Sequence, residues 1–156
     1  MAMKNCGFII VLSLGLAGCL SAGTHGYVKA YRYSTTKHEL EKAIGQAIAQ
    51  HPAITQDSVK GYYNDDTNYV TITIVEKGRS YDYTFRYYGG EEYWDTSKTS
   101  EVFIAYARNE KGEGGSSGNG GIKWYDLKLK KELTGPFERI FVSQIDSVLR
   151  MSHTEE

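Results

Sequence analysis

Two neighbouring segments of the chain alternate between apolar and polar side chains, and this pattern constrains the fold more than any other feature. Residues 69–75 place three branched apolar side chains on one side of an extended chain, and residues 81–87 place four aromatic side chains on one side. Alternation with a period of two is typical of strands in a half-exposed antiparallel sheet. Residues 76–80 between them have the composition of a turn, so the two strands are predicted to be neighbours.

The same reasoning predicts further strands along the chain. Residues 59–63, 102–108 and 122–129 are each rich in β-branched, aromatic or apolar residues. Residues 27–33 also alternate, which suits either a short first strand or an extended lead-in. The loops between successive strands are short, which favours an antiparallel meander.

Two amphipathic helices are predicted to flank these strands. Thr36 and Glu39 form a capping-box pattern, and Pro52 ends the helix that follows. Its apolar stripe consists of Leu40, Ala43, Ile44, Ala47 and Ile48. Residues 135–136 are predicted to open a last helix with Pro136 in its first turn, and residues 152–156 are expected to fray. The predicted class is therefore α+β, with a meander sheet of about five strands and both helices packed on one face.

The first nineteen residues have the layout of an export signal. Lys4 supplies a basic start, and residues 8–16 form an apolar core that is too short to cross a bilayer. Two small residues follow, and then Cys19. The chain has two cysteines, and both Cys6 and Cys19 fall within this segment, so neither supplies a disulfide to the domain behind it.

The sequence Leu-Ala-Gly-Cys at residues 16–19 resembles the lipobox of bacterial lipoproteins. The resemblance implies that residues 1–18 are a cleaved signal peptide and that Cys19 carries the lipid that attaches the protein to a membrane. Residues 19–26 would then form the lipidated cysteine and a short tether, and residues 27–156 a single domain. Leu20 stands where an aspartate is associated with retention in the inner membrane, which favours the periplasmic face of the outer membrane.

Charge and motifs exclude several functions. A formal net charge of −1 provides no basic field for nucleic acid. The four histidines lack the spacing of metal ligands, and the glycine-rich residues 112–121 lack the lysine of a phosphate-binding loop. Ser116 fits the letters of a nucleophile motif with Asp146 and His153, but it is expected in a hairpin loop between two strands and not between a strand and a helix. We therefore predict no metal, no cofactor and no catalytic residues.

Two groups of residues are candidates for ligand binding. Tyr81, Tyr83 and Tyr87 lie on one face of a predicted strand and form either an open aromatic surface or part of the core. Residues 87–95 combine aromatic and acidic side chains in a loop, and the candidates there are Glu91, Glu92, Tyr93 and Trp94. Such a loop suits a protein, peptide or glycan ligand, or it is a solvated turn whose aromatic rings fold back onto the sheet.

Three functions are consistent with these features. The favoured one is a lipid-anchored, non-catalytic binding or scaffolding domain with an envelope protein, peptide or glycan as its partner. The second is an envelope immunity protein that neutralises a toxin acting in the periplasm. The third is an enzyme acting on cell-wall glycan, in which carboxylates among Glu91, Glu92 and Asp95 supply the acid and base.

Overall fold

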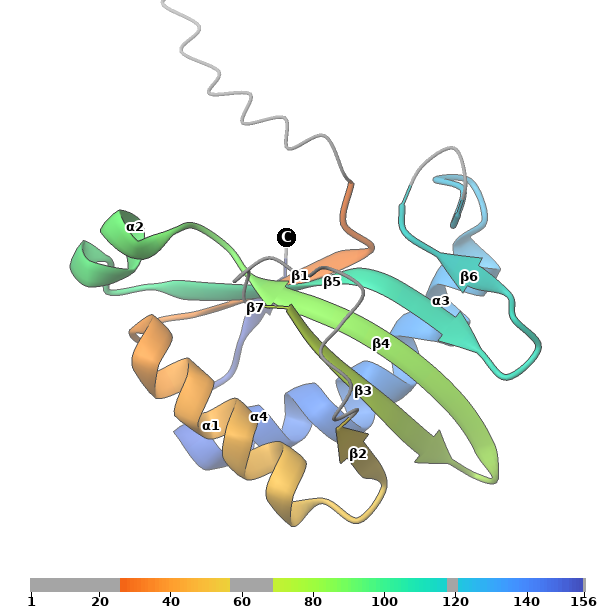
Figure 1. The fold of residues 1–156 in the computed structure, drawn as a ribbon, viewed down its shortest axis with the longest axis horizontal. Coiled ribbons are helices and arrows are strands. Elements are labelled where there is room, and N and C mark those ends of the chain that lie inside the picture. The colour runs from red at the N-terminus through yellow and green to blue at the C-terminus, as the bar shows by residue number, and fades with distance from the viewer. Residues whose placement is uncertain (1–25, 57–68, 118–120, 156) are drawn as a thin grey trace, which may run out of the picture.

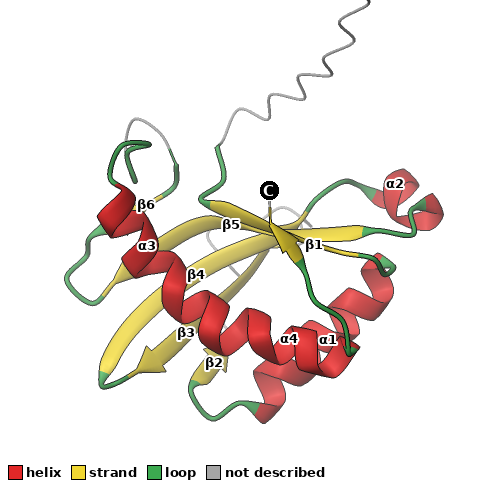
Figure 2. Ribbon diagram, turned by 180° about the vertical axis from the view of Figure 1, so that it is seen from behind, coloured by secondary structure: helices red, strands yellow, loops and turns green. Residues whose placement is uncertain are grey.

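The computed structural model describes residues 26–56, 69–117 and 121–155. The predicted signal peptide, Cys19, residues 20–25 of the tether and the predicted strand at residues 59–63 lie outside these ranges. The described chain forms an antiparallel sheet with helices on one face, which confirms the predicted α+β class (Figure 1 and Figure 2).

The sheet of the described residues contains seven strands, more than the five expected. They are β1 (Lys29–Tyr33), β2 (Ile54–Gln56), β3 (Tyr69–Glu76), β4 (Arg79–Tyr87), β5 (Ser100–Asn109), β6 (Gly114–Gly115) and β7 (Thr154–Glu155). Their spatial order is β2-β3-β4-β5-β1-β7, with β6 also paired to β5. Strands β2 to β5 form an antiparallel meander, in which β3, β4 and β5 correspond to predicted strands and β2 was not predicted. β1 pairs with the other edge of β5.

The hairpin of β3 and β4 confirms the alternating pattern. Ile72 lies opposite Tyr83 in the register of the two strands, and Ile74 lies opposite Tyr81. The connection consists of Lys77 and Gly78, both with positive φ (52° and 76°). Two consecutive residues with positive φ match the right-handed twist of the strands on either side, so this tight turn fixes the register of the hairpin.

The first helix, α1 (Lys37–Gln50), has the predicted start and stripe. The Thr36 hydroxyl accepts a hydrogen bond from the Glu39 backbone N–H at 3.3 Å, and this bond caps the helix. Four residues of the predicted stripe are buried and the fifth packs against them: Leu40, Ala43, Ile44, Ala47 and Ile48. A second helix, α2 (Glu91–Thr96), lies between β4 and β5 and was not predicted.

The prediction of a strand at residues 122–129 and of a helix start at Pro136 was wrong. A single helical stretch runs through α3 (Leu127–Pro136), the π-helix η1 (Phe137–Val142) and α4 (Ser143–Leu149). Figure 2 shows this stretch crossing one face of the sheet beside α1. Asp126 caps its start, since the carboxylate accepts the Leu129 N–H at 3.0 Å. Pro136 is buried inside the helix, at the residue directly before the π turn.

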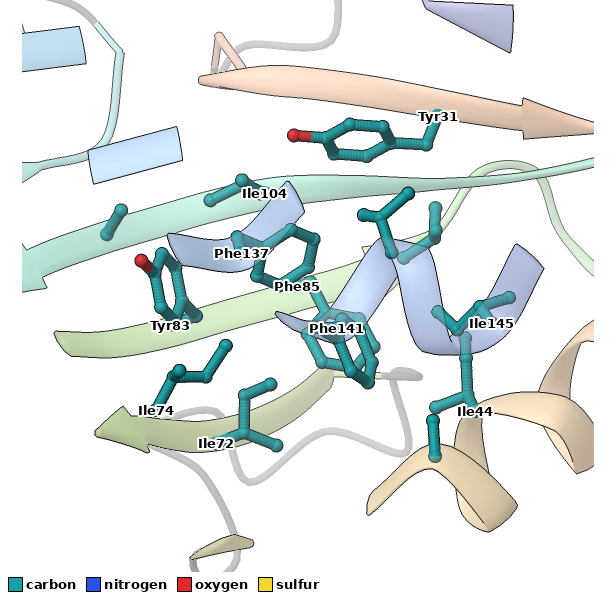
Figure 3. Close-up of a cluster of buried hydrophobic side chains, with 14 of the residues drawn as sticks. Tyr31, Ile44, Ile72, Ile74, Tyr83, Phe85, Ile104, Phe137, Phe141 and Ile145 are labelled. Carbon is teal, nitrogen blue, oxygen red and sulfur yellow. The ribbon is translucent and has the colours of Figure 1, made fainter. Parts of the chain in front are cut away.

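The core lies between the sheet and the helices. Figure 3 shows Tyr83 and Phe85 of β4 packed against Phe137 and Phe141, with Ile145 next to α1. The ring centroids of Phe137 and Phe141 are 4.9 Å apart. Every described core side chain lies at Val28 or later in the chain.

The predicted aromatic face of β4 belongs to this core. Tyr81, Tyr83 and Tyr87 are each at most 4% exposed, because the helices cover that side of the sheet. Burial raises the pKa of the Tyr83 and Tyr87 hydroxyls well above the usual value. These three tyrosines therefore do not form the open ligand surface considered above.

The C-terminal segment does not fray between residues 152 and 155. β7 pairs with β1, and the Lys29 ammonium lies 2.9 Å from the Glu155 carboxylate. His153 Nδ1 lies 3.0 Å from Asp146 of α4, which fastens the segment to the last helix. Sequence patterns missed this pairing because a two-residue strand carries no periodicity.

Candidate functional site

The remaining predicted site residues lie together at one end of the sheet, in a segment that we call the α2 corner. It consists of α2 and the residues that lead into it, 88–90. Figure 1 and Figure 2 show α2 at the opposite end of the sheet from β6. The corner brings Glu91, Glu92, Tyr93 and Trp94 onto six consecutive helical residues.

A glycine allows the corner to fold tightly. Gly89 has a φ of +94°, and a Cβ atom there would lie 2.5 Å from the Tyr93 ring. Only glycine combines that backbone angle with so close an approach. The Trp94 backbone N–H then donates to the Gly90 carbonyl at 3.0 Å and begins the first turn of α2.

Trp94 faces the domain and fixes the corner to it. The indole N–H donates to the Tyr88 carbonyl at 2.7 Å, and the ring is half-buried against the core. The Lys37 ammonium lies 4.8 Å from the Trp94 ring centroid and 5.1 Å from that of Tyr87. Trp94 therefore follows the alternative in which the ring folds back, and its polar atom is already used within the chain.

Tyr88 and Tyr93 form the outer side of the corner. Their ring centroids are 5.9 Å apart in an edge-to-face arrangement, and 43% and 38% of the two side chains are exposed. The Tyr93 hydroxyl lies 3.5 Å from that of Thr99, and hydrogen bonds from Ser97 and Thr99 lower the pKa of Tyr93. The two rings are thus held in place before any ligand arrives.

Three exposed carboxylates lie on the same short helix as Tyr93. Glu91 and Glu92 occupy the first turn of α2, where the helix dipole favours negative charge, and Asp95 lies one turn further. An exposed pair of aromatic rings bordered by carboxylates can bind a cationic side chain over a ring face, or an apolar patch bordered by basic groups. The α2 corner is therefore suited to binding a basic protein or peptide surface.

The structure brings together two of the three residues that matched a nucleophile motif. Asp146 and His153 are hydrogen-bonded, but His153 Nε2 faces a second carboxylate, that of Glu155, at 3.9 Å. The Tyr31 ring packs against the imidazole with centroids 5.4 Å apart, while Ser116 lies in the loop after β6. The pair therefore links α4 to β7.

The described ranges were also compared with the requirements of metal and membrane sites. They contain no group of three or more His, Cys, Asp or Glu side chains that could hold a metal ion. They also contain no helix that is both long enough and apolar enough to cross a bilayer.

Sequence reasoning missed other exposed residues. Tyr88 contacts the Tyr93 ring edge to face, but it was not among the candidates chosen in this loop, which began at Glu91. Trp124 and Tyr125 are both strongly exposed, because they precede a helix and are not part of a strand. Two adjacent aromatic residues cannot both face the core from one strand, and that signal was available in the sequence.

Comparison of the chain with protein family models, with curated proteins and with solved structures yields no match in any of the three. The function is therefore argued from the α2 corner and from the N-terminal sequence.

Proposed function

We propose that this chain is a lipid-anchored protein of the bacterial cell envelope whose domain binds a partner without catalysing a reaction. The lipobox-like sequence ending at Cys19 supports the anchor, and Leu20 supports the periplasmic face of the outer membrane. The single observation that carries the binding role is the α2 corner, where two fixed aromatic rings and three carboxylates are exposed.

The α2 corner has the properties of an interaction surface. Tyrosine supplies a large contact area with few rotatable bonds, so little conformational entropy is lost on binding. Here the rings of Tyr88 and Tyr93 are already oriented by their mutual contact and by the Gly89 turn. The surrounding acidic groups favour a basic protein or peptide as the partner over a neutral glycan.

The same corner is less suited to glycan hydrolysis. A glycosidase places two carboxylates on opposite sides of the glycosidic bond that it cleaves. One of them must stay protonated, which requires an apolar environment. Glu91, Glu92 and Asp95 are instead exposed side chains on one short helix. This placement favours the binding role.

One observation also favours the immunity-protein alternative. Enzymes that attack nucleic acid or anionic lipids carry basic surfaces, and an exposed acidic corner would complement such a surface. A gene for a secreted toxin next to this one would support the alternative. A gene that stands alone would count against it.

Lipid attachment is tested in cells that express the full chain with labelled palmitate. We expect the label on the wild-type chain and on Cys6→Ala, because Cys6 leaves with the signal peptide. Cys19→Ala should lose the label and leave the membrane fraction. A labelled Cys19→Ala chain would contradict the anchor.

Partner binding is tested with the chain from residue 20 onward, tagged at its C-terminus and incubated with envelope extract and with isolated cell wall. Glu91→Lys with Tyr93→Ser should weaken retention of a protein partner about tenfold or more, as at an interface hot spot. Glu39→Lys with Tyr106→Ser is the matched control, since Glu39 also lies in the first turn of a helix and Tyr106 is equally exposed. Equal loss in both double variants, or no retained partner at all, would refute the binding role.

A further inference from the structure

The most exposed apolar side chains of the described ranges cluster at the start of α3. Trp124, Tyr125 and Leu127 are 85%, 65% and 70% exposed, and the rings of Trp124 and Tyr125 contact each other at 5.5 Å. We call these three residues the Trp124 tip. A soluble domain rarely exposes an aromatic cluster of this kind without a partner for it.

The fold holds the Trp124 tip in place. Ile122 is buried, and its N–H donates to the Ser116 carbonyl at 2.9 Å. A Cβ atom on Gly121 would lie 2.0 Å from that carbonyl, so the close approach of the two backbone segments here requires glycine. On the other side of the tip, Asp126 caps α3. The exposure of the tip is thus a product of the fold and not of a loose loop.

The tip lies beside the point where the chain enters the domain. Gly26, the last residue of the tether, forms an antiparallel bridge with Ser117, which in turn forms a bridge with Ile122. Figure 1 and Figure 2 show the start of the described chain and the segment after β6 at the same edge of the molecule. The seven residue-to-residue steps from Cys19 to Gly26 reach about 25 Å at most. A lipid on Cys19 would therefore keep this edge close to the bilayer.

The charge around the tip is positive, although the whole chain is near neutral. Residues 121–131 contain four lysines and one acidic residue, and that residue is the helix cap Asp126. Lys128 and Lys131 are exposed, and within the described residues they form no ion pair. Lys131 lies one helical turn after Leu127 and thus on the same face of α3.

We propose that the Trp124 tip inserts into the headgroup region of an anionic phospholipid bilayer, with Lys128 and Lys131 against the lipid phosphates. Tryptophan and tyrosine are favoured at the boundary between water and hydrocarbon, and lysines are attracted to an anionic surface. The location of the tip beside the tether rests on the lipid anchor proposed above. With the lipid and the tip both attached to the bilayer, the α2 corner at the other end of the sheet remains open to a partner.

The test uses the chain from residue 20 onward, which lacks the lipid. The chain has two tryptophans, and Trp94→Phe leaves Trp124 as the one that reports fluorescence. Vesicles of phosphatidylcholine, with or without phosphatidylglycerol, are titrated into the protein. We expect Trp124 emission to shift to the blue and to be quenched by lipids brominated on their acyl chains. This response should be strong only with the anionic lipid.

Further substitutions in the Trp94→Phe background measure, by co-sedimentation with vesicles, how much each residue contributes to membrane binding. Lys128→Gln and Lys131→Gln should each lower the partition coefficient on anionic vesicles about fivefold. Trp124→Ser should lower it about tenfold or more. Lys42→Gln, an exposed lysine of α1, and Tyr106→Ser are the matched controls and should leave partition unchanged.

Three outcomes would overturn the proposal. The first is a Trp124 emission that stays that of an indole in water, both in the unlipidated chain and in the acylated chain attached to vesicles. The second is an equal response with neutral lipid. The third is a blue shift that depends on protein concentration without lipid, which would assign the tip to a second copy. The two proposals can fail separately. If Cys19 takes up no palmitate but the tip still binds anionic vesicles, the anchor is refuted and the tip proposal stands.

Discussion

Removing the Tyr83 hydroxyl should show how much a buried hydrogen bond adds to stability beyond the burial of the ring. The hydroxyl donates to the Leu133 carbonyl at 2.7 Å, and both residues are fully buried. In a regular α-helix that carbonyl would accept the Phe137 N–H, but here this N–H donates to Thr134 at the start of the π turn. Tyr83 therefore donates to this carbonyl in place of the Phe137 N–H.

Tyr83→Phe removes the hydroxyl and keeps the ring. A net intramolecular hydrogen bond is worth about 1 kcal/mol, and an unsatisfied buried acceptor costs about 1–3 kcal/mol. The lost desolvation penalty of the hydroxyl offsets part of this, so we expect a loss of about 2 kcal/mol in the free energy of unfolding. For a domain of this size the midpoint of thermal unfolding should fall by about 6–10 °C.

Urea denaturation of the chain from residue 20 onward measures this loss, with an unchanged m-value as the sign of an intact fold. Tyr81→Phe is the matched control, since Tyr81 lies on the same face of β4, is also buried and forms no hydrogen bond through its hydroxyl within the described residues. It should change stability by less than about 0.5 kcal/mol. If the two variants lose the same amount, the Leu133 carbonyl does not depend on Tyr83 and the reasoning fails.

Three further predictions concern stability. The Tyr33 hydroxyl is buried without a hydrogen bond of good geometry, so Tyr33→Phe should be neutral or stabilising by up to about 1 kcal/mol in the same urea assay. Hydrogen bonds from Arg139 at 2.9 and 2.7 Å lower the pKa of Glu76. This pair therefore stabilises the fold above about pH 4.5, and its contribution disappears as the pH falls. Glu76→Gln should reduce the loss of unfolding free energy at acid pH, and Glu91→Gln should not. Burial raises the pKa of Tyr31 and of the other core tyrosines, so stability should fall as the pH rises past about 10, and these phenols should ionise only with unfolding when absorbance is followed at alkaline pH.

Each of these has a result that would count against it. Destabilisation of Tyr33→Phe by more than about 1 kcal/mol would mean that the hydroxyl has a real partner, with Asp146 the nearest candidate. An acid limb that is identical in Glu76→Gln and the wild type would remove the pair from the pH dependence. Complete phenol ionisation near pH 10 in a folded chain would show that the aromatic core admits water.

The sequence was sufficient where one local rule and one periodicity agreed. At α1 the Thr36 cap, the apolar stripe and Pro52 all indicate the same helix. At the β3–β4 hairpin the alternation and the Lys77–Gly78 turn agree in the same way. Such agreement leaves few alternatives for the chain to adopt.

Elsewhere two periodicities competed. Leu127 and Leu129 alternate with lysines, which suggests a strand, but Leu129, Leu133 and Phe137 are spaced by four residues, as in a helix. The spacing of four continues through Pro136, which a local rule treats as a helix start. Pro136 instead lies inside the helix, directly before the π turn, and neither the π turn nor the Tyr83 contact to Leu133 is visible in a sequence window.

The acidic and aromatic composition of residues 87–95 identified the α2 corner as a surface, but it did not identify which ring is free. That depends on Gly89, which turns Trp94 inward and leaves Tyr88 and Tyr93 outside. The aromatic face of β4 was ambiguous for a different reason. A strand pattern specifies that one face is apolar, and only the position of the helices decides whether that face is covered.

The placement of β1 has a consequence for the order in which the chain matures. β1 is synthesised first and lies next to the proposed anchor, yet both of its neighbours come later: β5 about seventy residues on, and β7 at the very end of the chain. During export the N-terminus would reach the membrane while β1 still lacks both pairing edges. A chain that stops short of residue 154 would leave one edge of β1 open at the bilayer, where an unpaired edge invites aggregation or proteolysis.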